Sequence, residues 1–279
     1  MKVKIYLLVI SFNLFAIGFD AIEIYTFPND LSLSGAGVAS RELLYGNPAI
    51  TQDENSTISF SSNKFNEYSS SGNSLLFSKK GYALSISSQK IDDIEIRDEI
   101  PSDDPLDIVA LPFLSIGISK GIELENNLQL GVGVHYYYSD LWIEKDKEFT
   151  FDFGLKKIFL KNFQIGCMIK DVSINQSKIP INYIAGISYL NERYNTEVLL
   201  DYNYSNSYHN AVHVGVIQKI KILTLNFGYS SNLSDIHKTT ISSGFKVDIN
   251  NNYSFLYSFL SHLNTNLGPS HYFGVGISI

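Results

Sequence analysis

Histidine residues are the first place to look for chemistry in this sequence, because histidine binds metals and transfers protons. The six histidines are at positions 135, 209, 213, 237, 262 and 271. His209 and His213, four residues apart in a strand, would share a face about 13 Å apart, too far for one metal ion. His135 or His213 could pair with inward serine and aspartate residues as a hydrolase requires, but their spacing does not favour this over ordinary hydrogen bonding. With no His-Glu-x-x-His or Cys-x-x-Cys motif, we predict no enzyme, no metal and no cofactor.

Acidic residues form the strongest local signal. Between Lys90 and Pro112 lie Asp92, Asp93, Glu95, Asp98, Glu99, Asp103, Asp104 and Asp107, with Lys90 and Arg97 as the only basic residues. Two interpretations remain open. The segment is a solvated loop that its charge keeps soluble, or it binds a basic segment of a partner or a divalent ion bridging anionic surface glycans.

The N-terminal residues indicate export. Lys2 and Lys4 precede an apolar stretch that ends at Ile17, with small residues near a suitable cleavage point, which predicts a signal peptide over 1–18. The alternative, a membrane anchor, is disfavoured because the apolar stretch is short. Loss of the two lysines takes the net charge from −7 to −9, and no basic patch is present, so nucleic acid is not an expected partner.

Most of the remaining chain alternates between apolar and polar residues, the period of a β-strand. The pattern is clearest over 128–138. Fourteen segments follow it: 56–62, 73–79, 82–89, 113–120, 128–138, 149–157, 163–171, 183–190, 194–204, 211–219, 223–230, 239–248, 253–262 and 271–279. An even number of strands close to the length that crosses a bilayer at a tilt predicts an all-β, 14-stranded antiparallel transmembrane β-barrel.

Loop lengths separate a barrel from a secreted β-sandwich, the main alternative. Odd-numbered connections such as 90–112 and 172–182 are longer than even-numbered ones such as 80–81 and 220–222. Outer-membrane barrels have long external loops and short periplasmic turns, whereas a sandwich has no reason to sort its loops in this way. This places the acidic segment outside the cell.

The barrel prediction also assigns faces. The apolar set of each strand faces lipid, and the polar set faces the lumen. The charged or imidazole residues expected inside are His135, Asp152, Lys156, Lys170, Asp201, His213, Lys246 and Asp248. Tyr138, Tyr204, Tyr229 and Tyr253 are expected in interfacial girdles. Cys167 is the only cysteine in the sequence, so it cannot form an intramolecular disulfide. We expect it to be buried or to face lipid.

The chain ends on an alternating segment, His271–Ile279. A strand that runs to the last residue needs a partner for its edge, which a closed barrel supplies by pairing the last strand with the first. Phe273, Val275, Ile277 and Ile279 would form an outward row that resembles the terminal signal recognised by barrel-assembly machinery.

Between the signal peptide and the first strand, residues 19–55 break the strand pattern, and Val38–Leu44 could form a short helix. The segment contains Gly35 and Gly37, and then Asn47, Pro48 and Ala49. This arrangement resembles the N-terminal hatch of FadL-like outer-membrane barrels, in particular the PorV/PorQ family. The resemblance implies that 19–55 plugs the lumen of a barrel formed by 56–279. A mobile linker is the alternative.

We weigh three functions, and the short length of the chain and the lack of an extra apolar loop to capture ligands favour the first. A PorV/PorQ-like protein would associate with type IX protein secretion or surface display, with secreted proteins or secretion components as partners besides outer-membrane lipid and the barrel-assembly machinery. A FadL-like protein would be a passive channel for small hydrophobic molecules such as fatty acids or hydrocarbons, with an opening in the wall and an apolar pocket under the hatch. The third possibility is a structural role as an adhesin or membrane-stabilising protein.

Overall fold

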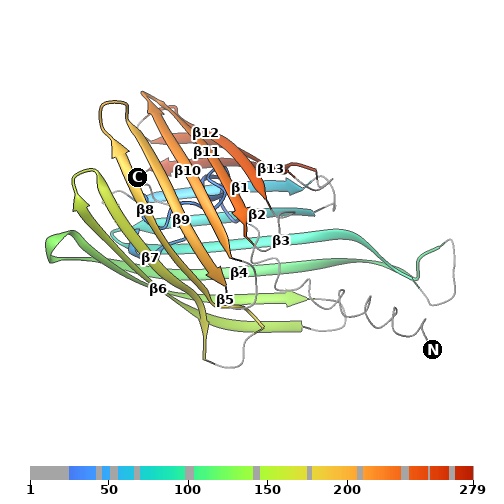
Figure 1. Cartoon of the computed structure of the whole chain (residues 1–279). Helices are drawn as coiled ribbons and strands as arrows, with labels where there is room; N and C mark the ends of the chain where they lie inside the picture. Colours follow the sequence, from blue (N-terminus) through green and yellow to red (C-terminus); the bar gives the residue numbers. More distant parts are fainter. Residues whose placement is uncertain are drawn as a thin grey trace.

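The computed structural model of the protein is a closed barrel that carries its own N-terminal segment inside the lumen (Figure 1). The structure describes residues 25–41, 46–50, 56–65, 70–97, 104–140, 145–174, 178–205, 210–233, 239–250, 252–263 and 268–278. The predicted signal peptide lies outside these ranges. No helix in the described part of the chain is long and apolar enough to cross a membrane.

Fourteen antiparallel strands form the wall, which confirms the predicted fold class. The strands are β1 (Thr57–Phe65), β2 (Ser70–Lys79), β3 (Tyr82–Ile96), β4 (Asp107–Leu124), β5 (Leu128–Asp140), β6 (Lys145–Leu160), β7 (Phe163–Ser173), β8 (Asn182–Asn191), β9 (Thr196–Ser205), β10 (Ala211–Ile220), β11 (Leu223–Asn232), β12 (Thr240–Asp248), β13 (Tyr253–His262) and β14 (Ser270–Ser278). Each pairs with its neighbours in sequence, and β14 pairs with β1 to close the barrel.

The two ends of the barrel differ in the length of their connections. One end has tight turns such as 80–81, 161–162 and 221–222, with a 3₁₀ turn η3 (Glu125–Asn127) between β4 and β5. The opposite end has longer connections such as 97–106 and 174–181. The predicted parity is therefore present, and we refer to the two ends as the short-turn end and the long-loop end.

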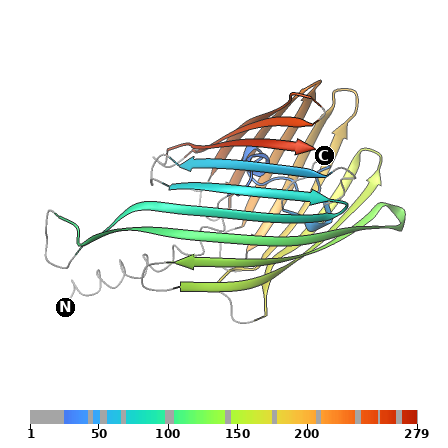
Figure 2. The ribbon, with the colours of Figure 1, turned by 180° about the vertical axis from the view of Figure 1, so that it is seen from behind.

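The largest departure from the predicted boundaries is in β3 and β4. The sequence predicted a loop over 90–112, but the two strands continue as a paired hairpin to Ile96 and Asp107. Beyond the neighbouring strands this hairpin projects from the long-loop end (Figure 2). A register shift between Ile91 and Ile94, with Asp93 at a φ of +61°, marks a β-bulge where the ribbon leaves the wall.

Side chains sort between the two faces as predicted. Outward positions carry exposed apolar residues such as Val132, Phe153 and Phe227, while Asp152, Lys156 and Asp201 are buried in the lumen. Lys246 and Asp248 lie near the short-turn rim and form an ion pair with a separation of 3.0 Å. The outward face is thus apolar enough to contact lipid, and the charged groups are inside or at the rims.

The predicted surroundings of the last strand are also confirmed. β14 lies between β1 and β13, with Phe273, Val275 and Ile277 exposed on the outward face. Ile279 lies outside the described residues. Cys167 is exposed on the outward face of β7, beside Ile165 and Ile169.

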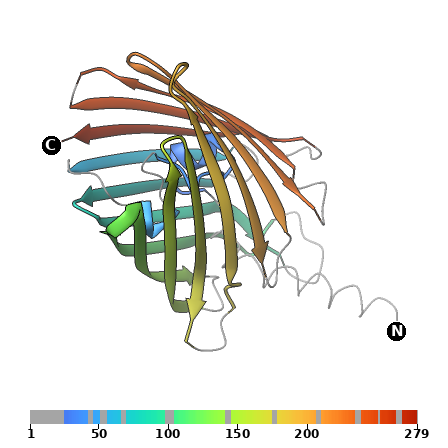
Figure 3. The same ribbon diagram turned by 60° about the vertical axis from the view of Figure 1, so that its left-hand side comes forward.

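Residues Tyr25–Arg41 and Gly46–Ile50 lie inside the barrel, visible as the blue segment in Figure 3. We call these two ranges the luminal segment. It contains a short helix α3 (Pro28–Ser32) and a 3₁₀ turn η2 (Pro48–Ile50). The helix that the sequence allowed over Val38–Leu44 is not present in its described part, because the backbone groups of Val38 and Arg41 bond to side chains of Asp201, Asn47 and Glu197. The helix begins instead at Pro28, whose fixed φ suits a first helical position.

Candidate functional site

The luminal segment contacts the barrel wall at inward-facing glycines that lie at about the same height in neighbouring strands. On eight strands, an inward glycine has so little space above it that an added methyl group would contact the segment. These glycines are Gly131 (β5), Gly154 (β6), Gly166 (β7), Gly186 (β8), Gly215 (β10), Gly228 (β11), Gly244 (β12) and Gly274 (β14). We call this row the glycine belt.

Distances show how closely the segment lies on the belt. A Cβ atom at Gly166 would be 2.7 Å from the carbonyl carbon of Val38, and one at Gly228 would be 2.5 Å from the backbone nitrogen of Ser34. Real Cβ atoms do not approach so closely, so only glycine permits this contact. The wall is therefore shaped to receive the backbone of the segment.

On β9 the belt is interrupted by Asp201, which pairs across the strands with Gly186. Its Oδ2 atom accepts hydrogen bonds from the backbone nitrogens of Gly37 at 2.6 Å and Val38 at 2.9 Å. The side chain is 1% exposed. A buried carboxylate that accepts two N–H groups forms strong, charge-assisted hydrogen bonds, so Asp201 fixes the turn of the segment to the wall.

The second half of the segment is held by groups near the short-turn end. Lys156 Nζ donates to the Ser40 carbonyl at 2.6 Å, and Glu197 Oε1 accepts from the Arg41 backbone nitrogen at 3.1 Å. Asn47 Nδ2 donates to the Val38 carbonyl at 2.7 Å, and its Oδ1 accepts from the Ala49 nitrogen. Asn47 therefore ties two parts of the segment together.

The first half makes a different set of contacts. The hydroxyls of Ser34 and Ser242 are 2.7 Å apart, and Ser258 donates to the Pro28 carbonyl at 2.6 Å. Tyr272, fully buried, donates to the Tyr25 carbonyl at 2.6 Å. Because these partners lie on β12, β13 and β14, the segment is anchored over much of the circumference of the barrel.

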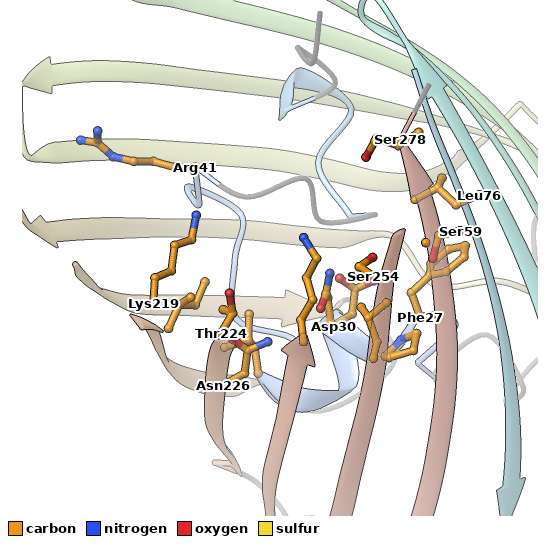
Figure 4. A pocket seen from close by; sticks show the side chains of 18 of the residues that line it. Phe27, Asp30, Arg41, Ser59, Leu76, Lys219, Thr224, Asn226, Ser254 and Ser278 are labelled. Carbon is orange, nitrogen blue, oxygen red and sulfur yellow. The ribbon is translucent and has the colours of Figure 1, made fainter. Parts of the chain in front are cut away.

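Below the segment, toward the short-turn end, lies a cavity of about 580 Å³. We call it the vestibule. Among the described residues that line it, Arg41, Lys156, Lys219 and Lys246 are basic and Asp30 is acidic, a net charge of +3. Apolar side chains, among them Phe27, Leu76 and Leu256, form another part of the lining. Figure 4 shows Arg41 and Lys219 on one side of the cavity and Phe27 and Leu76 on the other.

Toward the long-loop end, the segment is flanked by a buried cluster of ionisable side chains. His135 Nε2 and Asp152 Oδ2 are 3.1 Å apart. Asp152 Oδ1 accepts from the Asp171 nitrogen at 2.9 Å, and Tyr137 donates to Asp171 Oδ1 at 2.8 Å. Lys170 and Asp171 together oppose Asp152 in a β-bulge, with Asp171 at a φ of +64°. The bulge brings both side chains close to the cluster.

Ser119 lies beside this cluster, but it does not stand on a nucleophile elbow. Ser119 lies inside the pattern Gly117-Ile118-Ser119-Lys120-Gly121, which has the letters of a nucleophile elbow. The pattern stands in the middle of β4, paired throughout with β5, whereas an elbow requires a strained turn between a strand and a helix. In the described residues, no group of three or more histidine, cysteine, aspartate or glutamate side chains could hold a metal ion.

The residues predicted from the sequence separate into different regions. Gly35, Gly37, Asn47, Pro48 and Ala49 all lie in the lumen. Of the acidic residues, Asp92, Asp93 and Glu95 are in β3, Asp107 begins β4, and Asp104 precedes it, while Asp98, Glu99 and Asp103 lie outside the described residues. Lys90 pairs with Asp92 at 2.5 Å, and Arg97 pairs with Glu95 at 2.6 Å.

Sequence reasoning missed the glycine belt and the vestibule. It placed Asp201, Lys156 and Lys246 inside the barrel, but gave them no role. A signal was available for the belt, since the inward glycines recur in many of the alternating segments. That these glycines lie at the same height in the barrel follows only from the strand register, which pairs Gly131 with Gly154, Gly166 with Gly186 and Gly215 with Gly228.

No protein-family model and no curated protein matches the sequence. Solved structures with a similar fold were found. The CymD monoaromatic hydrocarbon channel aligns with a TM-score of 0.62 and 12% identity, covering 90% of this chain and 96% of the channel. A TodX deltaS2S3 mutant monoaromatic hydrocarbon channel aligns with a TM-score of 0.62 and 11% identity, covering 84% and 92%. The fold of this chain is therefore similar to the fold of these two channels.

Proposed function

We propose that this protein is an outer-membrane channel for small hydrophobic molecules, closed in the observed state by its luminal segment. The observation that carries the proposal is the seating of the segment on the glycine belt. On eight strands, the residue of the wall that faces the segment is a glycine, and a larger side chain there would collide with the segment. Such a fit is expected of a plug and not of a linker that happens to enter the lumen.

The contacts of the segment are suited to a plug that can leave. It is held to the wall by separate side-chain hydrogen bonds, such as those of Asp201, His213 and Ser258, and adds no strand to the sheet. Release would therefore leave the hydrogen bonds between the strands intact. Apolar contacts, such as the cluster of Leu33, Ala36, Leu199 and Ile217, would be exposed to a passing ligand.

The likeness to two hydrocarbon channels supports this function over the PorV/PorQ-like function that the sequence favoured. Both neighbours named above are monoaromatic hydrocarbon channels by description, and their alignments cover most of both chains. A role in type IX secretion or surface display has no support from these neighbours. These neighbours support an outer-membrane transport barrel, and we do not propose a secretion partner for it.

A disulfide that locks the segment tests the proposal. The hydroxyls of Ser34 and Ser242 are close enough for a Ser34→Cys/Ser242→Cys pair to form a bond in a Cys167→Ser background. We expect the oxidised protein in liposomes to pass toluene at the rate of protein-free liposomes, and dithiothreitol to restore passage. Ser34→Cys alone is the control and should be insensitive to oxidation. Equal toluene flux in the locked and reduced forms would reject the proposed function.

A further inference from the structure

We propose that the vestibule binds an amphiphilic organic anion on the short-turn side of the luminal segment, and that this binding weakens the hold of the wall on the segment. The inference rests on the proposed function, because it names a ligand class and a release mechanism for the same plug. It is drawn from the charge, the shape and the contacts of the vestibule.

The charge of the vestibule is opposite to that of the whole chain. The protein carries a net charge of −7, whereas the described lining of the vestibule has four basic residues and one acidic residue. Lys219 pairs across the strands with Thr224, and Thr224 pairs with Lys246, so the two lysines stand in one row on β10 and β12. Lys246 is also paired with Asp248 at 3.0 Å, and Lys219 is exposed, so the row would attract an anion at the open, short-turn side of the vestibule.

The lining also has an apolar side, which sets the kind of anion. Phe27 and Leu76 pack together with Ala83, and Figure 4 shows them across the cavity from Arg41 and Lys219. A volume of about 580 Å³ lies within the range of pockets that enclose small organic ligands. An anionic group at the basic side and a hydrocarbon body against Phe27 would match both parts of the lining.

Two of the basic residues connect the vestibule to the plug. Lys156 lines the cavity and also donates to the Ser40 carbonyl, and Arg41 both lines the cavity and belongs to the segment. A carboxylate is a stronger acceptor for a lysine ammonium group than a neutral carbonyl is. A bound anion would therefore compete with Ser40 for Lys156 and loosen the segment at its Ser40–Arg41 end.

Binding is tested with a charged probe and a neutral probe of the same shape. The full chain in nanodiscs is titrated by calorimetry with 4-butylbenzoate and with 4-butylbenzamide, and empty nanodiscs correct for partition into lipid. We expect the benzoate to bind at least tenfold more tightly. Lys219→Gln/Lys246→Gln should remove this preference, and Lys221→Gln, in the adjacent exposed turn, should retain it. Equal affinities for the two probes, or an unchanged preference in the double variant, would overturn the proposal.

Release of the plug is tested by labelling. In an Ala39→Cys variant with Cys167→Ser, the new cysteine replaces a fully buried residue of the luminal segment that packs against the wall. We expect 4-butylbenzoate, and not 4-butylbenzamide, to raise its maleimide labelling rate several-fold, and Lys156→Gln to abolish this effect. A rate that does not respond to the benzoate would contradict the release mechanism.

Flux of neutral butylbenzene separates the two proposals. Flux through the protein together with equal binding of both probes would retain the channel function and reject the anion site. Charge-selective binding without any flux would retain the site and reject the channel function.

Discussion

Replacement of Asp201 by alanine should release the luminal segment without unfolding the barrel. The change removes the acceptor of two buried N–H groups, those of Gly37 and Val38. Hydrogen bonds to charged groups contribute about 1.5–3 kcal/mol each. Part of this is offset because the change also removes a buried charge whose Oδ1 atom has no hydrogen-bond partner. We expect the free energy of segment attachment to fall by about 2–4 kcal/mol.

The matching change in population can be measured. A loss of about 2–4 kcal/mol corresponds to roughly a 30- to 700-fold larger fraction of released segment. In the Ala39→Cys, Cys167→Ser background, the maleimide labelling rate should rise by a factor in this range. Asp201→Asn is the matched control, because its amide oxygen can still accept both N–H groups but without the charge, and the increase should be about fivefold.

The barrel itself should be unaffected, since Asp201 contributes only its backbone to the sheet. The heat-modifiable electrophoretic mobility of a folded barrel should therefore be the same in all variants. If Asp201→Ala labels at the rate of the parent protein while the barrel is folded, the role of Asp201 as the anchor of the segment is wrong.

Further predictions concern the wall and the long-loop end. Gly166→Leu should displace Val38 and raise Ala39→Cys labelling, whereas Gly46→Leu, with open space around its Cβ position, should not; equal labelling would argue against the belt. Changing Ile277 and Ile279 to Asp should prevent membrane assembly, because charge would face lipid at an unfavourable free energy of up to a few kcal/mol; a normal heat-modifiable barrel would count against the transmembrane reading. Deletion of 92–107 should abolish a co-purifying partner or a calcium dependence while the barrel still assembles, and unchanged partner binding would exclude a binding role for the acidic residues.

The strands could be predicted from the sequence because lipid imposes a strict alternation on the wall. In Leu128–Asp140 and Tyr253–His262, apolar or aromatic residues occupy every second position up to Tyr138 and Phe259, and the predicted limits differ from the observed ones by two residues or none. Outside the wall the constraint disappears. Beyond the bulge at Asp93, the ribbon of β3 and β4 has no neighbouring strand in its described part, and its acidic residues hide the strand period.

The site was harder to predict because its contacts join distant parts of the chain. Asp201 could be placed in the lumen by alternation, but its partners Gly37 and Val38 are more than 160 residues away. The vestibule required the register of strands from β10 to β12, which brings Lys219 and Lys246 into one row. The helix at Pro28 had a local signal, the proline itself, that the sequence reasoning passed over.

The contacts of Tyr25, Thr26 and Pro28 stabilise the closure of the barrel between its first and last strands. Thr26 accepts from Ser74 on β2, Pro28 accepts from Ser258 on β13, and Tyr25 accepts from Tyr272 on β14. These three strands stand on both sides of the joint between β1 and β14, where the two ends of the sheet meet through nine register pairs. The segment therefore connects the two sides of this joint from inside the lumen through side-chain hydrogen bonds. A chain from which it is removed should separate at this seam first when heated.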